Sequence, residues 1–192
     1  MPMRAWLKFI AIGSIFATVE EFLTVALLKR DMGSYLFTLL VLFPIFLSVI
    51  FGAGRLLQRI IRTQAKSDLA LFCLSGGAGL MIEWFLIGLS PWSNANANAV
   101  LMLLFQLGMF SFWATVGFAP WLMLKRDEMS EQASRYIWRF FIVYFAVVYG
   151  VAFALPQQKR FGPVICLIIL GYFVVCGILI HNIGRRGLAF SN

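Results

Sequence analysis

The chain has 192 residues, of which 61% are hydrophobic and 16% aromatic, and it carries a formal net charge of +8. Charged residues make up only 12% of it, about half their usual share in soluble domains, and this excludes an ordinary soluble fold. The basic residues lie between long apolar runs, so we expect no nucleic-acid partner. Cys73, Cys166 and Cys176 lie within apolar runs without redox or metal-binding spacing, so we expect packing thiols, no metal and no cofactor.

Apolar runs long enough to cross a bilayer as helices occur six times along the chain. They cover approximately residues 5–28, 34–54, 69–91, 98–124, 136–155 and 162–183. We therefore expect an all-α fold in which residues 1–192 form a single transmembrane helical domain. The first run lacks a small-residue cleavage site, so we expect it to stay in the membrane as a helix rather than act as a signal peptide.

Basic residues are distributed unequally between the two sides of this predicted bundle. With six crossings, the side that holds both termini carries twelve of them and the other side carries four. The positive-inside rule then places both termini in the cytoplasm, as in a multi-pass protein of a bacterial-type inner membrane. The uncharged segment that contains Asn94, Asn96 and Asn98 is predicted to be an external turn.

Four basic residues after the second run recur at helical spacing, namely Arg55, Arg59, Arg62 and Lys66. The spacing predicts an amphipathic cytoplasmic extension of that helix. We expect this face to attract anionic lipid headgroups, since each basic residue near a membrane surface contributes ~1 kcal/mol. Docking of an acidic protein partner is the alternative. The mixed-charge segment 125–131 could begin a short helix at Ser130, and its sequence indicates no function.

Glu83 is a carboxylate within the glycine-rich, apolar third run. A charged side chain at the bilayer centre costs roughly 2.5–3.5 kcal/mol on insertion scales, so such residues are usually paired, protonated or exposed to a wet cavity. Glu20 and Glu21 lie on the small, polar face of the first run, and all three glutamates fall ~12 to 14 Å below the external end at 1.5 Å per residue. Gln106 and Tyr149 fall near the same level, which predicts a polar layer in the outer half of the bilayer.

The first and third runs resemble each other at an offset of 63 residues, which aligns Gly13 with Gly76 and Glu20 with Glu83. Small residues let membrane helices approach closely. We therefore expect these two helices to pack directly against each other, with Glu20 or Glu21 within hydrogen-bonding distance of Glu83. If the resemblance reflects a duplication, the site would lie at the interface of the repeats, as in many transporters.

Two glutamates in one apolar pocket cannot both ionise at low cost, so we expect one to hold a proton unless a cation bridges them. Trp84 and Trp113 lie near this layer and could contact a ligand that has an apolar or cationic face. In the purely structural alternative, Glu83 hydrogen-bonds Gln106 or Glu20 and only joins helices. His181, near the cytoplasmic end of the last run, is expected at the membrane interface.

These residues favour a transport-type protein that binds or transports a small or lipophilic ligand, or protons. A membrane-embedded enzyme is the first alternative, in which Glu20 or Glu21 and Glu83 act as acid and base on an isoprenoid or another lipid. An accessory subunit with a protein partner in a larger membrane complex is the second alternative.

Overall fold

A computed structural model describes residues 3–89, 98–125 and 127–189, and all the regular elements in these ranges are helical. They build six rods that are long and apolar enough to cross a membrane. The rods are α1 (Met3–Glu21) with η1 (Phe22–Leu28); α2 (Met32–Phe37) with η2 (Thr38–Leu42) and α3 (Phe43–Ile60); α4 (Gln64–Ile82) with η3 (Glu83–Ile87); α5 (Ala99–Met123); α6 (Glu128–Ala154); and α7 (Gln157–Ala189). The predicted all-α architecture with six helices of membrane-spanning length is confirmed.

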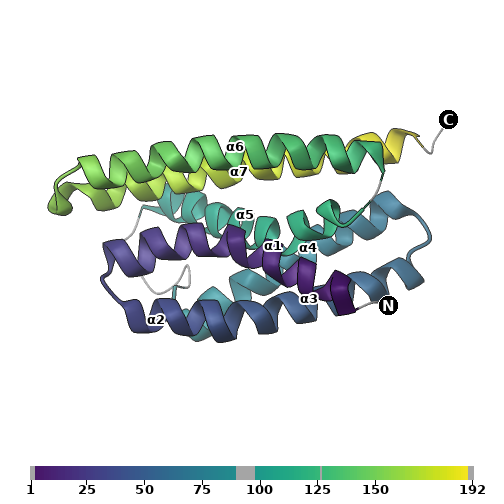
Figure 1. The fold of residues 1–192 in the computed structure, drawn as a ribbon, viewed down its shortest axis with the longest axis horizontal. Helices are drawn as coiled ribbons and strands as arrows, with labels where there is room; N and C mark the ends of the chain where they lie inside the picture. The colour runs from purple at the N-terminus through teal and green to yellow at the C-terminus, as the bar shows by residue number, and fades with distance from the viewer. Residues whose placement is uncertain (1–2, 90–97, 126, 190–192) are drawn as a thin grey trace.

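Helix α5 occupies the centre of the bundle. Every residue from 111 to 122 is buried, so all faces of the helix are covered there, as expected for a helix that is apolar all round. It packs against α1, α3, α4, α6 and α7, whereas α6 and α7 form a hairpin along one side (Figure 1). The two chain ends lie at the same end of the bundle (Figure 1).

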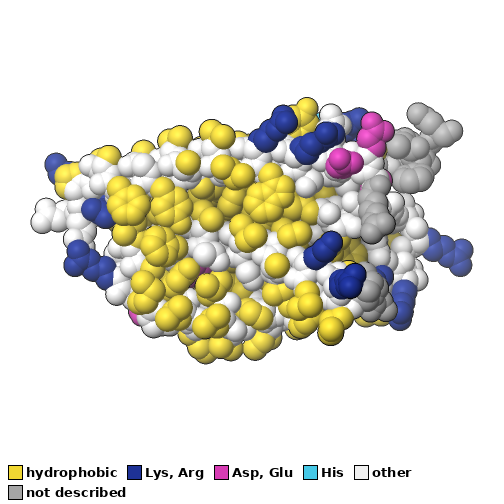
Figure 2. Space-filling view, viewed as in Figure 1, with side chains coloured by type: hydrophobic (Ala, Val, Ile, Leu, Met, Phe, Trp, Pro, Cys, Tyr) yellow, Lys and Arg dark blue, Asp and Glu magenta, His cyan; other side chains and the backbone are white. Residues whose placement is uncertain are grey.

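Side-chain type follows the position along the bundle. Figure 2 shows hydrophobic side chains over the middle of one face and lysines and arginines toward its two ends, most of them at the end that holds the termini. This distribution fits a multi-pass membrane protein, because an apolar band must match the hydrocarbon layer while charged groups stay in water or among headgroups.

Short polar side chains mark where several helices begin. Asp31, Asn98 and Asp127 each precede a helix and accept a hydrogen bond at 2.9 Å from a backbone N–H two or three residues later. The third rod ends earlier than predicted, at Ile87, because Gly88 adopts a left-handed conformation with φ 82°. Asn94 and Asn96 of the predicted external turn lie outside the described residues.

The predicted extension of the second helix is wrong as a continuous helical face. Helix α3 ends at Ile60, Ile61 is extended at φ −97° and ψ 108°, and α4 starts only at Gln64. The four basic residues therefore come from two different helices and the turn between them. Three of these four side chains are exposed, namely those of Arg59, Arg62 and Lys66.

Two smaller predictions also differ from the structure. No separate short helix begins at Ser130, because α6 runs without interruption from Glu128 to Ala154. Cys73 and Cys166 are exposed on the outside of the bundle. Among the cysteines only Cys176 is buried, where its thiol donates to the Ser111 carbonyl at 3.4 Å.

The predicted direct packing of the first and third rods through their glycines is wrong. A Cβ atom at Gly76 would overlap the ring of Phe110, and one at Gly79 would overlap the indole of Trp113, so these α4 glycines accommodate α5. Gly13 of α1 lies against side chains of α3 and the backbone of α5. The small residues do allow close helix contact, but α5 is the helix that both faces share.

Replacing Gly79 by Ala should destabilise the bundle, because the added methyl group would displace Trp113 from the core. Overpacking of this kind typically costs about 1–3 kcal/mol. Gly77→Ala is the matched control on the same helix, since its Cβ would have no neighbour within 4 Å. We expect the melting temperature in detergent micelles to fall for Gly79→Ala and to stay or rise for Gly77→Ala. Equal melting temperatures would contradict the close contact.

Candidate functional site

Three glutamates from two rods lie near one another in the half of the bundle away from the chain ends. Glu21 ends α1 and Glu83 starts η3, and their residues are only 6% and 3% exposed. Glu20 is half-buried beside them. Glu20 and Glu21 are both within electrostatic range of Glu83, and Lys29, exposed at the end of η1, is within range of all three. The site therefore gathers three acidic side chains near one exposed amine.

Glu83 and Glu21 differ in their hydrogen-bond partners. The indole Nε1 of Trp113 donates to Glu83 Oε1 at 3.0 Å, in a fully buried contact between α5 and η3. Within the described part of the chain, the Glu21 carboxylate receives no hydrogen bond and forms no ion pair. Neither oxygen of Glu21 is fully enclosed, because Arg160 Nε is the one fully buried side-chain polar atom without a partner in the described ranges. A carboxylate that is mostly removed from water is nevertheless costly as an anion.

Both helices change their hydrogen-bonding pattern at the glutamates. The α1 helix becomes π-helical at Phe22, directly after Glu21, and α4 does so at Glu83 itself. π-Helical turns are rare, and they occur frequently at functional sites. Glu21 is the last α-helical residue before one of these turns and Glu83 is the first residue of the other, whereas η2 in the second rod contains no acidic residue.

Hydroxyl groups hold the backbone of α1 where it approaches η1. Three hydroxyl groups donate hydrogen bonds to backbone carbonyl oxygens in the last part of α1. These bonds connect that part of α1 to α6, to α7 and to the turn that follows it. The donors are Thr24 to Glu20 at 3.1 Å, Tyr149 to Val19 at 3.1 Å and Tyr172 to Phe16 at 2.8 Å. Tyr149 was predicted to belong to the polar layer, and its hydroxyl group binds the backbone there.

Gln106 and Trp84 form a second polar contact near the site. Trp84 Nε1 donates to Gln106 Oε1 at 2.7 Å, and Gln106 Nε2 donates to the Leu89 carbonyl at 3.2 Å. These bonds join α5 to the end of the third rod. The hydrogen bond between Glu83 and Gln106, considered from the sequence, is not formed, and Trp113 takes that place.

A second polar cluster, at the end that holds the chain termini, was missed by the sequence analysis. Asp68 of α4 is fully buried, and Lys125 Nζ lies 2.5 Å from both of its carboxylate oxygens. Arg186 of α7 lies 3.6 Å from Asp68 and 2.7 Å from Asp127. It also hydrogen-bonds Ser130. Two acids and two bases thus form a neutral network.

The protonation of this network follows its surroundings. Burial lowers the pKa of the Lys125 amine, although Asp68 acts in the opposite direction. Burial opposes ionisation of Asp127, but hydrogen bonds from Ser130 and Arg186 hold its pKa below the usual value. Each group has a partner of opposite charge, so the network serves to join α4, α7 and the segment before α6.

A metal site is not indicated. Across the described ranges, no group of three or more His, Cys, Asp or Glu side chains is arranged to hold a metal ion. His181 is exposed on α7, away from the glutamates.

Comparison with protein-family models, curated proteins and solved structures finds no match to this chain. The fold and site together define its class, a helical protein that fits a membrane and contains a buried cluster of carboxylates.

Replacing Asp68 by Asn should strongly destabilise the protein, because Lys125 would lose its buried counter-charge and Arg186 would keep only Asp127. Breaking a buried ion pair costs about 3–5 kcal/mol. Glu131→Gln is the control, since Glu131 is exposed and outside the network, and surface changes usually stay within about 0.5 kcal/mol. Denaturant unfolding in detergent measures both. An Asp68→Asn variant as stable as the control would contradict a structural role for the network.

Proposed function

We propose that this chain is an integral membrane protein that binds or transports a small or lipophilic ligand, or protons, through Glu20, Glu21 and Glu83. The observation that carries the proposal is the Glu21 carboxylate, which is mostly removed from water, has no protein donor among the described residues and lies within electrostatic range of Glu83. A polar group left unpaired in a low-dielectric interior is costly, and it is retained where a ligand or a proton completes it.

The surroundings of the carboxylates suit this role. Trp113 fixes one oxygen of Glu83, so the other oxygen and Glu21 remain for a ligand. Tyr149 and Tyr172 hold the α1 backbone, which keeps Glu20 and Glu21 in position relative to α6 and α7. A preorganised site of this kind binds a cation or a proton without reordering the helices around it.

The unequal environments of the glutamates also support a second candidate function. Glu83 accepts a hydrogen bond and Glu21 does not, and two carboxyl groups in different surroundings can divide the roles of general base and general acid. A membrane-embedded enzyme acting on an isoprenoid or another lipid would use Glu83 and Glu21 in this way.

We also propose the orientation in which both termini are cytoplasmic and the carboxylates lie in the outer half of a bacterial-type inner membrane. The distribution of basic residues supports it. The exposed Arg59, Arg62 and Lys66 would then face anionic headgroups of the inner leaflet, although they do not share one helical face.

Glu21→Gln and Glu83→Gln should each reduce proton entry into proteoliposomes to the level of empty vesicles. Glutamine keeps the side-chain volume but cannot exchange a proton. Wild-type protein is reconstituted with an entrapped pH-sensitive dye, and an inward potential is imposed with potassium and valinomycin. Glu131→Gln, on the exposed surface of α6, is the control and should conduct like wild type.

If wild-type protein conducts no protons, the mass of the molecule that co-purifies with it decides between the remaining functions. Ligand binding predicts that Glu83→Gln purifies with less of that molecule. An enzyme would keep its lipid and lose turnover. Absence of both proton flux and a bound molecule from wild-type protein would contradict the proposed function.

Cysteine labelling should verify the orientation. In a variant without native cysteines, Lys159→Cys at the start of α7 should react with an impermeant thiol reagent in intact cells. Glu131→Cys, at the other end of α6, should react only after the cells are opened. Both positions are exposed, so accessibility in the fold does not limit the reaction. The reverse pattern would place the carboxylates in the cytoplasmic half of the membrane.

A further inference from the structure

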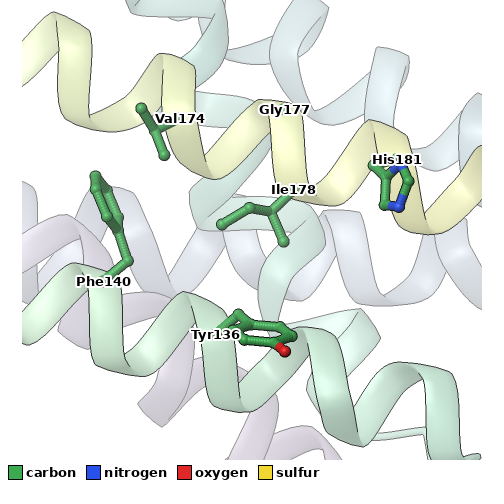
Figure 3. Close-up of a pocket in the computed structure, with 6 residues that line it drawn as sticks. All are labelled: Tyr136, Phe140, Val174, Gly177, Ile178 and His181. Carbon is green, nitrogen blue, oxygen red and sulfur yellow. The ribbon is translucent and has the colours of Figure 1, made fainter.

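The outer face of the α6–α7 hairpin contains an open groove of about 500 Å³. Figure 3 shows its lining, with Phe140 and Val174 at one end and Tyr136 and His181 at the other. From Val174 to His181 the groove follows α7 for about 10 Å at 1.5 Å per residue. One leaflet of the hydrocarbon core is ~15 Å thick, so the groove matches most of the length of an acyl chain.

A glycine on α7 leaves the centre of the groove open. Gly177 lies at its centre, and a Cβ atom there would meet nothing within 4 Å. Gly184, seven residues further, is equally open, and of the positions on this stripe between the two glycines His181 carries the polar side chain that lines the groove. The remaining lining is apolar apart from Tyr136 and His181, as an acyl chain requires.

Polar and basic groups gather at the end of the groove nearest the chain termini. Tyr136 and His181 are exposed there, and each can donate a hydrogen bond to a phosphate. Arg185 follows His181 by one helical turn, so it lies on the same face of α7. It is exposed and, in the described part of the chain, forms no ion pair.

We propose that this groove binds one anionic phospholipid of the leaflet that contains the chain termini. An acyl chain would occupy the space over Gly177, and the phosphate would lie against Tyr136, His181 and Arg185. Basic pockets between membrane helices recognise anionic headgroups in this way. On α6, the residue one helical turn before Tyr136 on the same face is Gln132, which is uncharged. The exposed Glu131 lies on a different face of α6. The Tyr136 face of α6 therefore places no carboxylate against the phosphate.

A photoreactive phospholipid tests the proposal directly. Phosphatidylglycerol with a diazirine in one acyl chain is added to the detergent-purified full chain, irradiated, and the labelled peptides are mapped by mass spectrometry. We expect label within 136–140 and 174–181. Unlabelled phosphatidylglycerol should compete about fivefold better than phosphatidylcholine with the same chains, as expected for one basic residue near the phosphate.

Substitutions separate the two parts of the site. Gly177→Leu should fill the groove and remove the label, whereas Gly150→Leu, equally open on α6 but away from the groove, should leave it unchanged. Arg185→Gln should abolish the preference for phosphatidylglycerol but keep the label. Lys159→Gln, an exposed basic residue at the opposite end of α7, should change neither.

Three results would overturn the proposal. Equal competition by phosphatidylcholine would show an ordinary lipid at the protein surface. Competition by inorganic phosphate would show a site for free phosphate rather than for a lipid. Label spread over other helices, or lost equally in Gly150→Leu, would show that the groove is not the binding site.

Discussion

The contact between Gly79 and Trp113 positions the candidate site. Without a side chain at Gly79, α5 approaches α4 closely enough for the indole to enter the core. Glu83 lies one helical turn beyond Gly79 on the same face, so the indole N–H meets its carboxylate. The same packing that makes α5 the central helix therefore also orients the buried acid. Helix packing and site geometry depend on one small residue.

The two polar centres of the bundle differ in how well their charges are matched. At the end with the chain termini, Asp68, Lys125, Asp127 and Arg186 satisfy one another. In the other half, three glutamates lie near a single amine, that of Lys29, and Glu21 has no hydrogen-bond donor in the described ranges. A network in which every charged group has a partner is accounted for by a structural role alone. The three glutamates have no such matching partner among the described residues.

The sequence predicted correctly those features that depend only on the order of residues along the chain. Run length predicted six rods, and the rarity of carboxylates in apolar runs singled out Glu20, Glu21 and Glu83. Helical periodicity also identified the small faces of Gly13, Gly76 and Gly79, but a face does not reveal which helix covers it. Three-dimensional packing assigned those faces mainly to α5, and the direct contact of the first and third rods was therefore predicted wrongly.

Two features were missed because of assumptions about helices. Asp68 and Lys125 border apolar runs, where charges are expected in water, yet the ends of neighbouring helices bring them together in the interior. Counting at a constant 3.6 residues per turn cannot detect a π-helical segment, since its period differs.

The π-helical turns at η1 and η3 also bear on how these two helices can change in length. A π turn holds one residue more than an α turn, so each is a place where a helix can gain a residue while the packing on both sides survives. Glu21 and Glu83 border two turns of this kind, whereas η2 in the second rod shows that such a turn also forms in this chain without an acidic residue.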